Sequence, residues 1–401
     1  MVVTAKNKWV LMMLAGAAIV SVSLGTRSVF GLFLTPISNE LGTGLQLFSL
    51  AIALQNIVWG LASPLFGALA DRIGAWKVAA LGGIIYTAGL LSTALMVNEA
   101  GIFLGQFLIG LGMGSAGLSV ALGAVARAAP PEKRSIAMGL VTSFGSFGQF
   151  ALLPLTQIWI SGFGWQGAML ILSLLMAVSI AFALGLRGDN TAQTSDVAAI
   201  TAGEALKLAA KSRDYILLTT GFFVCGLQLV FITTHLPPFL EQSGLSSNMA
   251  SWSLAVVGLF NIAGAFILGW LGGIRSKRKT LATVYLLRSV VIVLFVMTPI
   301  TPITALIFGA AMGLLWLGTI PLTSGLIVVF FGPKHLSMLF GIAFLSHQIG
   351  SFLGAWLGGL IYDLTGDYML MWGLNAAAGL LAFAVNWMIT EDRPKPSTAP
   401  A

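Results

Sequence analysis

Arg27 stands out among the residues of this sequence that could take part in chemistry. It lies in SLGTRSVFGLFL, residues 23–34, where no neighbour carries a charge. A charge in apolar surroundings is stable only when it is paired or hydrated. All 13 acidic residues fall in loops, tails or helix ends, so no carboxylate is expected beside it. Because an arginine fork binds a carboxylate bidentately, we expect an anionic ligand to be its partner.

A structural anchor is the alternative for Arg27. It lies 18 residues after Trp9, or about 27 Å along a regular helix, from where its side chain could extend to outer lipid headgroups. Arg288 lies nine residues after Lys279, about 14 Å along its helix. We expect it to contact helix ends or headgroups, and we keep it as a second basic candidate for the substrate.

Two histidines are candidates for proton coupling, because the imidazole pKa is normally near 6.5. His347 lies in FLSHQIGSF with Gln348 beside it, and we expect both to contact substrate or protons. His235 precedes Pro237 and Pro238, which should break the helix near its outer end. The alternative for His235 is that it caps this kinked end.

Several neutral polar side chains also lie in apolar segments, where an unpaired polar group is costly. Hydrogen bonding between helices is their commoner use. Together with the charged candidates, the residues that we expect to contact substrate are Arg27, His347, Gln348, Asn261, Gln149, Gln228, Asn56 and Trp316.

The other chemistries have no support in the sequence. Cys225 is the single cysteine, which excludes an intramolecular disulfide and a thiolate metal cluster. No set of nucleophile, base and orienting residue appears, and no nucleotide-binding loop. The net charge of +7 is spread over short loops rather than along one face, which argues against nucleic acid. We therefore expect no enzyme activity, no cofactor and no metal.

The composition shows which elements must position these residues. Hydrophobic residues make up 57% of the 401 residues and charged ones only 8%, which is typical of a membrane protein. About 20 apolar residues cross a bilayer as a helix. Such windows occur twelve times, at 9–37, 47–69, 78–97, 101–128, 136–160, 164–186, 215–240, 248–272, 280–299, 301–331, 336–361 and 368–389.

The chain divides into two related halves. A shift of 202 positions aligns Pro36 with Pro238 and Gly148 with Gly350, among other Gly and Pro positions. We therefore expect six-helix halves at 1–186 and 215–401, arranged as parallel repeats with the substrate site between them. The polar stretch 187–214 links the halves, and its part GEALKLAAKSRDY could form an amphipathic helix on the membrane surface.

Charge asymmetry predicts the orientation. Lys and Arg outside the spans fall on the side of the N-terminus, whereas the charged residues of the opposite loops are all acidic. By the positive-inside rule, both termini and the central linker are cytoplasmic. The first apolar run is too long for a secretory signal peptide, so we expect a multi-pass protein of the cytoplasmic membrane with a retained N-terminus.

Between the second and third spans the chain reads GALADRIGAWKV, residues 67–78. This resembles the loop signature of the major facilitator superfamily, carried here by Gly67, Asp71, Arg72, Gly74 and Lys77. The resemblance implies an all-α membrane fold of twelve helices and a cytoplasmic gate. The repeat copy, GWLGGIRSKRKT, has Gly273 in place of Asp71, so a gate built from this motif should be asymmetric.

The segment TRSVFGLFLTPISNELG is similar to bacterial members of the monocarboxylate porter and oxalate/formate branch, which implies small carboxylate substrates. These relatives typically place a basic residue in span eight or eleven. Here span eight offers Asn261, and span eleven offers His347 and Gln348. Gln106 occupies the place of an arginine common in sugar and drug transporters, and span five has no Gly-Pro pair. Both features argue against drug efflux.

These observations predict a secondary transporter that moves a small organic anion, a mono- or dicarboxylate, by alternating access with proton symport. An anion exchanger is the main variant. A transporter of a larger neutral or heteroaromatic solute, such as a vitamin or drug, remains open, with Arg27 then structural. A receptor or scaffold is disfavoured because the 28-residue linker leaves no room for an output domain. The expected partners are substrate, protons and lipid, with the protein a monomer.

Overall fold

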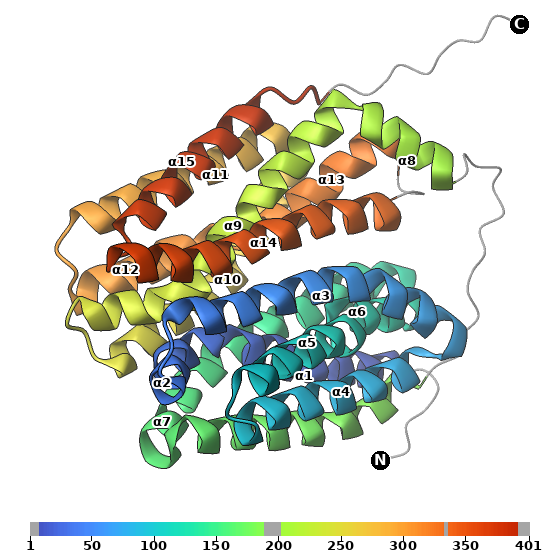
Figure 1. The fold of residues 1–401 in the computed structure, drawn as a ribbon. Helices are drawn as coiled ribbons and strands as arrows, with labels where there is room; N and C mark the ends of the chain where they lie inside the picture. The colour runs from blue at the N-terminus through green and yellow to red at the C-terminus, as the bar shows by residue number, and fades with distance from the viewer. Residues whose placement is uncertain (1–7, 188–201, 333–335, 392–401) are drawn as a thin grey trace, which may run out of the picture.

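The computed structural model of the chain describes residues 8–187, 202–332 and 336–391. Within these residues every regular element is a helix. The helices form two bundles, one from each half of the chain, that lie side by side (Figure 1). The described part of the chain begins and ends at the same end of the molecule, on the right in Figure 1, which we call the terminal end. We call the opposite end the distal end.

The N-terminal bundle contains seven α-helices. They are α1 (Lys8–Ser28), α2 (Phe30–Leu41), α3 (Leu45–Ile73), α4 (Ala75–Leu95), α5 (Glu99–Ala116), α6 (Leu118–Ala128) and α7 (Arg134–Ala183), with short 3-10 turns at Pro131–Lys133 and Leu184–Leu186. Helix α7 is long enough to cross a bilayer twice, and Gly164, with a φ of 72°, divides it. It therefore contains both spans expected at 136–160 and 164–186.

The C-terminal bundle contains another seven α-helices. They are α9 (Arg213–Gln242), α10 (Ser247–Ile274), α11 (Lys277–Met297), α12 (Pro302–Leu314), α13 (Thr319–Phe331), α14 (Leu336–Thr365) and α15 (Met369–Trp387). Between the two halves in the sequence, α8 (Ala202–Lys211) is the helix expected in the linker, and it packs against α9 and α14. In the described residues, 11 segments are long and apolar enough to span a bilayer. With the division of α7 they give the twelve spans that the sequence predicts.

Helix breaks follow the repeat. The fourth span is interrupted at Gly117, between α5 and α6, and the tenth span at residues 315–318, between α12 and α13. A shift of 202 places Gly117 on Thr319, the first residue of α13. The two halves therefore share the position of an irregularity as well as their glycines and prolines.

The most extensive contacts between the halves are two seams, α3 with α14 and α7 with α10, and α2 also packs against α9. In the first seam, a Cβ at Gly60 would meet the side chain of Gln348. In the second, a Cβ at Gly258 would meet the backbone carbonyl of Ser146. The 202-residue shift relates Ser146 to Gln348, so the seams are equivalent within the repeat. Glycine lets the backbones approach closely at both.

The prediction that α9 breaks at its prolines is wrong, since α9 continues through Pro237 and Pro238 to Gln242. These prolines cannot donate to the carbonyls four residues earlier, those of Thr233 and Thr234. Both carbonyls lie against Gly31 of α2, which has no side chain to clash with them. The helix therefore tolerates the missing donors through close packing against the other half.

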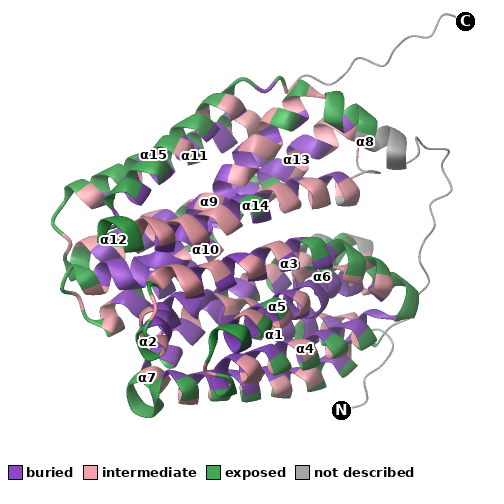
Figure 2. Cartoon of the chain, viewed as in Figure 1, coloured by how far each residue is buried: buried purple, intermediate pink, exposed green. Residues whose placement is uncertain are grey.

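Burial divides each helix into two faces. Figure 2 shows buried residues in the bundle interiors and along the contact between the halves, with exposed residues on the outer faces. Large apolar side chains on these outer faces include Leu65, which is 70% exposed, and Phe266, which is 78% exposed. Such a surface is suited to lipid rather than water. It agrees with a helix bundle that spans a membrane.

Candidate functional site

Arg27 lies in the last turn of α1, where the partial negative charge of the helix end favours a cation. Its side chain is half-buried at the contact between the halves. Nη2 donates to Oδ1 of Asn56 at 2.8 Å, whereas the buried Nε has no hydrogen-bond partner. The one salt bridge among the described residues joins Arg127 to Asp71, so none of their carboxylates pairs with Arg27. Nη1 forms no hydrogen bond within the described residues and is not enclosed as Nε is, so it is the donor that a ligand can reach.

A chain of hydrogen bonds links Arg27 to the other half of the protein. Asn56 donates from Nδ2 to the Ile52 carbonyl at 2.8 Å, which fixes its Oδ1 toward Arg27. Gln348 of α14 donates from Nε2 to the Asn56 carbonyl at 3.0 Å. Its Oε1 then accepts from Nδ1 of His347 at 3.0 Å. Four residues expected as substrate contacts, Arg27, Asn56, Gln348 and His347, are thus brought together across the first seam.

Aromatic rings surround this chain, and the sequence reasoning missed two of them. The ring of Trp59 lies 5.0 Å from Cζ of Arg27, within range for a cation–π interaction. Phe344 contacts Trp59 edge-on, with 5.2 Å between ring centroids. Both lie three residues from predicted site residues, Trp59 after Asn56 and Phe344 before His347. Since residues three apart share a helix face, this spacing was the available signal.

Asn261 forms hydrogen bonds both in the second seam and at the break in span ten. Its Nδ2 donates to Oγ of Ser146 at 2.8 Å, and its Oδ1 accepts from the Leu317 backbone at 2.9 Å. Gln149 lies in the same seam, against Gly258, and its buried Nε2 has no partner. Asn261 therefore joins the halves and holds the irregular segment between α12 and α13.

Two other predicted contacts lie inside the C-terminal half. Gln228 is fully buried and donates to the Asn375 carbonyl at 3.0 Å, which packs α9 against α15. Trp316 is 3% exposed and belongs to the break in span ten. Neither hydrogen-bonds to the Arg27 chain, so the structure does not group them with Arg27.

Arg288 is fully buried and binds the carbonyls at the end of α12, as one of the sequence alternatives proposed. Nε donates to the Leu315 carbonyl at 3.0 Å, and Nη2 donates to the carbonyls of Leu315 and Trp316. Nη1 donates to Sγ of Cys225 at 3.3 Å. The charge is therefore used to satisfy acceptors that the broken helix leaves unpaired.

His235 is enclosed within the C-terminal half. One ring nitrogen, Nε2, lies 2.7 Å from the Ala355 carbonyl and must donate to it, which leaves Nδ1 to accept from the Tyr368 hydroxyl at 3.4 Å. The Tyr368 hydroxyl is the donor in this second hydrogen bond. The neutral imidazole thus has both hydrogen bonds satisfied.

The loop motif at residues 67–78 forms its ion pair within the N-terminal half. Asp71 accepts from Nη1 of Arg127 at 2.7 Å, which ties the end of α3 to α6. Gly74 ends α3 with a φ of 103°, a conformation that favours glycine. Arg72 is exposed, and the Nζ of Lys77 lies 5.8 Å from the neighbouring Trp76 ring. A Cβ at Gly67 would meet nothing within 4 Å.

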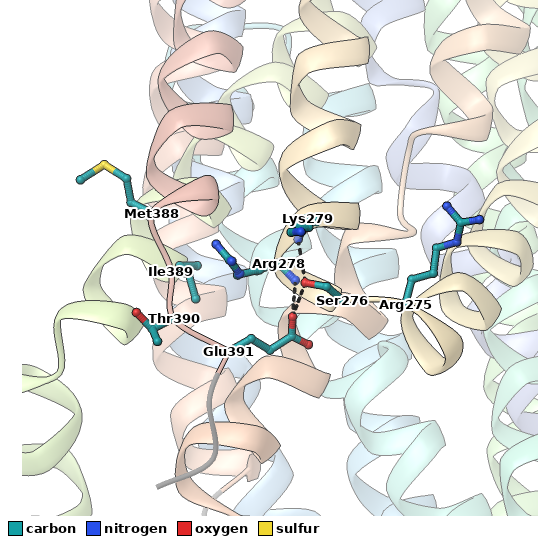
Figure 3. Close-up of a pocket in the computed structure, with 8 residues that line it drawn as sticks. All are labelled: Arg275, Ser276, Arg278, Lys279, Met388, Ile389, Thr390 and Glu391. Carbon is teal, nitrogen blue, oxygen red and sulfur yellow. Dashed lines mark hydrogen bonds between the residues drawn. The ribbon is translucent and has the colours of Figure 1, made fainter.

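A polar cavity of about 600 Å³ lies apart from Arg27, at the terminal end between α11 and α15 (Figure 3). The Glu391 carboxylate accepts from Ser276 and from the backbone N–H of Lys277 at 2.9 Å, so it caps α11. Arg278 donates in return to the Trp387 carbonyl at 2.7 Å. These bonds tie the end of α15 to the start of α11, which the sequence reasoning did not anticipate.

Comparison with known proteins adds to this geometry. The chain matches the Major Facilitator Superfamily over two overlapping stretches, residues 16–316 and 218–401. It is 26% identical over 379 residues to the Uncharacterized MFS-type transporter YcxA of Bacillus subtilis, covering 89% of this chain and 91% of that protein. Identity to Monocarboxylate transporter 13 of Rattus norvegicus is 27% over 349 residues, covering 83% of this chain and 76% of that protein.

Two further matches bear on substrate and fold. The Putative niacin/nicotinamide transporter NiaP of Bacillus subtilis is 28% identical over 280 residues, covering 69% of this chain and 65% of that protein. The crystal structure of a bacterial homologue of the human lysosomal transporter Spinster, inward-facing and occupied, superposes with a TM-score of 0.75 at 15% identity. That superposition covers 96% of this chain and 98% of the other. The chain belongs to the Major Facilitator Superfamily of membrane transporters.

Proposed function

We propose that this protein is a proton-coupled secondary transporter that carries a small organic anion across the cytoplasmic membrane by alternating access. The observation that carries the proposal is the half-buried Arg27 at the contact between the halves, with Nε unpartnered. A charge at bilayer depth costs about 2.5–3.5 kcal/mol on insertion scales unless it is compensated. A carboxylate would compensate it and accept two N–H groups from the fork.

The relatives support the choice of anion. Monocarboxylate transporter 13 is similar to this chain over most of its length, and so is Monocarboxylate transporter 11 of Homo sapiens, at 26% identity over 371 residues. Arg27 is the side chain of the proposed site that carries a permanent charge. We therefore assign the carboxylate contact to Arg27, with Asn56 positioning its guanidinium and Gln348 bridging to the other half.

Alternating access is supported by the way the halves touch. Asp363 reaches from α14 to the first turn of α3 at the distal end, and Gly31 packs on the carbonyls of α9. If the distal end faces outward, as the positive-inside rule implies, this is a conformation closed to the exterior. The opposite state would require these contacts to separate while the terminal ends approach.

Proton coupling is assigned to His347. Its Nδ1 hydrogen-bonds to Gln348, which in turn bonds to the backbone of Asn56, the residue that holds Arg27. Protonation of His347 would therefore act on the residues that position the substrate contact. His235, with both nitrogens already bonded inside the C-terminal half, is the weaker candidate. Anion exchange without protons is the variant that transport assays must separate from symport.

One observation favours a second candidate substrate. The Putative niacin/nicotinamide transporter NiaP is among the relatives, which fits a heteroaromatic solute that is neutral or charged. Nicotinate and nicotinamide have nearly the same shape and differ in charge, so they separate the two candidates directly. An anion transporter should take nicotinate and reject nicotinamide, whereas a transporter of neutral solutes should take both.

The test uses the purified full-length protein in proteoliposomes. We expect carboxylate uptake to fall about 100-fold or more in Arg27→Gln, and by about tenfold in Arg27→Lys, because lysine keeps the charge without the fork. Arg275→Lys, at an exposed position away from the seams, is the matched control. Full uptake of every carboxylate by Arg27→Lys would rule out bidentate recognition. If an imposed pH gradient of either sign leaves the rate of uptake unchanged, transport is not coupled to protons.

A further inference from the structure

We infer that the anion bound at Arg27 is a monocarboxylate with an aromatic ring, and that Trp59 and Phe344 form the surface on which this ring packs. The inference rests on the proposed anion-transport function and deepens it. It assigns to two side chains from opposite halves, α3 and α14, the selection of an aromatic over an aliphatic acid.

The rings form a continuous row that begins at Arg27. Trp59 lies 5.0 Å from Cζ of Arg27, and Phe344 contacts Trp59 edge-on at 5.2 Å between centroids. The His347 ring is stacked on Phe344 at 5.8 Å with 9° between the planes, and Phe222 follows 4.9 Å from His347. A ligand held by its carboxylate at Arg27 would therefore lie beside Trp59 of α3, which itself contacts Phe344 of α14.

Burial indicates which of these groups a ligand would meet. Asn56, Gln348, His347 and Phe222 are buried. Arg27, Trp59 and Phe344 are only half-buried, so part of each remains accessible. The accessible part of the site thus combines one cation with two rings. A short aliphatic acid would pair with the cation and leave the accessible parts of both rings uncovered.

The charge count points to one carboxylate rather than two. A dicarboxylate of similar length would need a second fixed cation near the rings. Arg288 is the other arginine deep within a span, and its Nε and Nη2 are bonded to the carbonyls of Leu315 and Trp316. The repeat does not duplicate the aromatic surface either, because Asn261 stands 202 positions after Trp59. The site is therefore one-sided, with a charged end and an aromatic end.

The test measures binding by equilibrium dialysis of radiolabelled benzoate to the purified full-length protein in detergent, with unlabelled competitors. Cyclohexanecarboxylate matches benzoate in charge and size but lacks the ring electrons, benzamide lacks the charge, and terephthalate adds a second carboxylate. We expect benzoate to bind about two- to tenfold more tightly than cyclohexanecarboxylate, the range of an aromatic contact beyond its area. Benzamide should not compete, and terephthalate should compete more weakly than benzoate.

Variants show which side chains cause the preference for benzoate over cyclohexanecarboxylate. Trp59→Leu and Phe344→Leu should each reduce the ratio of benzoate to cyclohexanecarboxylate affinity toward one, whereas Trp59→Phe should retain most of it. Trp270→Leu, at a position that is 59% exposed on α10, is the matched control for the loss of an indole ring. Thermal unfolding of each variant identifies proteins that have lost their fold. If Trp59→Leu does not fold, the affinity ratio is measured in Trp59→Phe and Phe344→Leu instead.

The outcomes separate this inference from the proposed function. Equal affinity for benzoate and cyclohexanecarboxylate in the wild-type protein, with both lost in Arg27→Gln, would overturn the aromatic assignment and leave anion transport standing. Binding of acetate but not benzoate would do the same. Benzoate binding that is unchanged in Arg27→Gln, or that benzamide displaces equally well, would instead overturn the anion site itself.

Discussion

The carboxylate of Asp363 in the C-terminal half accepts the backbone N–H of Leu45 in the N-terminal half, with 2.9 Å between Oδ1 and N. Its Oδ2 accepts from the Gln46 backbone at 2.8 Å. Helix α3 begins after Gly44, which has no side chain to cap it. The cap of this helix is therefore supplied by the other half, and it is lost whenever the distal ends separate.

We predict that Asp363→Ala shifts the protein toward the state that is open at the distal end. A helix cap is worth about 0.5–2 kcal/mol, so the population of that state should rise by about two- to thirtyfold. A membrane-impermeant maleimide reports the change through Ile37→Cys, a fully buried position on α2, in a Cys225→Ser background. Labelling should be faster in Asp363→Ala by the same factor.

Asp367→Ala is the matched control for this experiment. Asp367 is exposed at the same end of the molecule, but it accepts from Met369 within its own half, at 2.9 Å. Labelling should therefore remain at the wild-type rate. If Asp363→Ala and Asp367→Ala label alike, Asp363 does not contribute to closing the distal end.

A second prediction concerns His347. If protonation of its imidazole acts through Gln348 on the Arg27 contact, His347→Gln should abolish stimulation of uptake by an inward pH gradient. Exchange of labelled for unlabelled substrate, which needs no net proton movement, should continue. His235→Gln should instead lower thermal stability, because it removes hydrogen bonds to Ala355 and Tyr368 inside the C-terminal half. The reverse pattern would assign the coupling to His235.

A third prediction concerns the structural role of Arg288. Arg288→Leu leaves the buried carbonyls of Leu315 and Trp316 without their donor, and each such loss costs about 1–3 kcal/mol. We therefore expect the free energy of unfolding to fall by about 2–6 kcal/mol. Arg275→Leu, at an exposed position, should change it by less than about 0.5 kcal/mol. Unchanged thermal stability with lost substrate binding would place Arg288 in the substrate site instead.

A fourth prediction is that Asn261 and Ser146 act as a pair. Asn261→Ala removes two hydrogen bonds, to Ser146 and to the Leu317 backbone, and should cost about 2 kcal/mol of stability. Ser146→Ala removes one of them and should cost about 1 kcal/mol. A double-mutant cycle followed by thermal unfolding should show that the two losses are not additive. Additive losses would mean that the bond across the second seam contributes nothing.

Much of the fold could be predicted because membrane helices follow from local sequence. Runs of about 20 apolar residues must form helices, since a backbone in lipid has no other way to satisfy its polar groups. The repeat of 202 residues predicted the two halves, and the structure extends the repeat to the breaks after α5 and α12. The expected break at Pro237 failed because local propensity ignores Gly31, which lies in the other half.

The sequence by itself determined the membrane class of the protein, its repeat, and the presence of a cation in a span without a matching acid. The tertiary structure alone decided which polar residues meet. It joined Arg27 to Asn56, Gln348 and His347, assigned Arg288 to the carbonyls of a broken helix, and added Trp59, Phe344 and Asp363. These contacts link residues as far apart as 318 positions, and no local pattern encodes a distance across two packed halves.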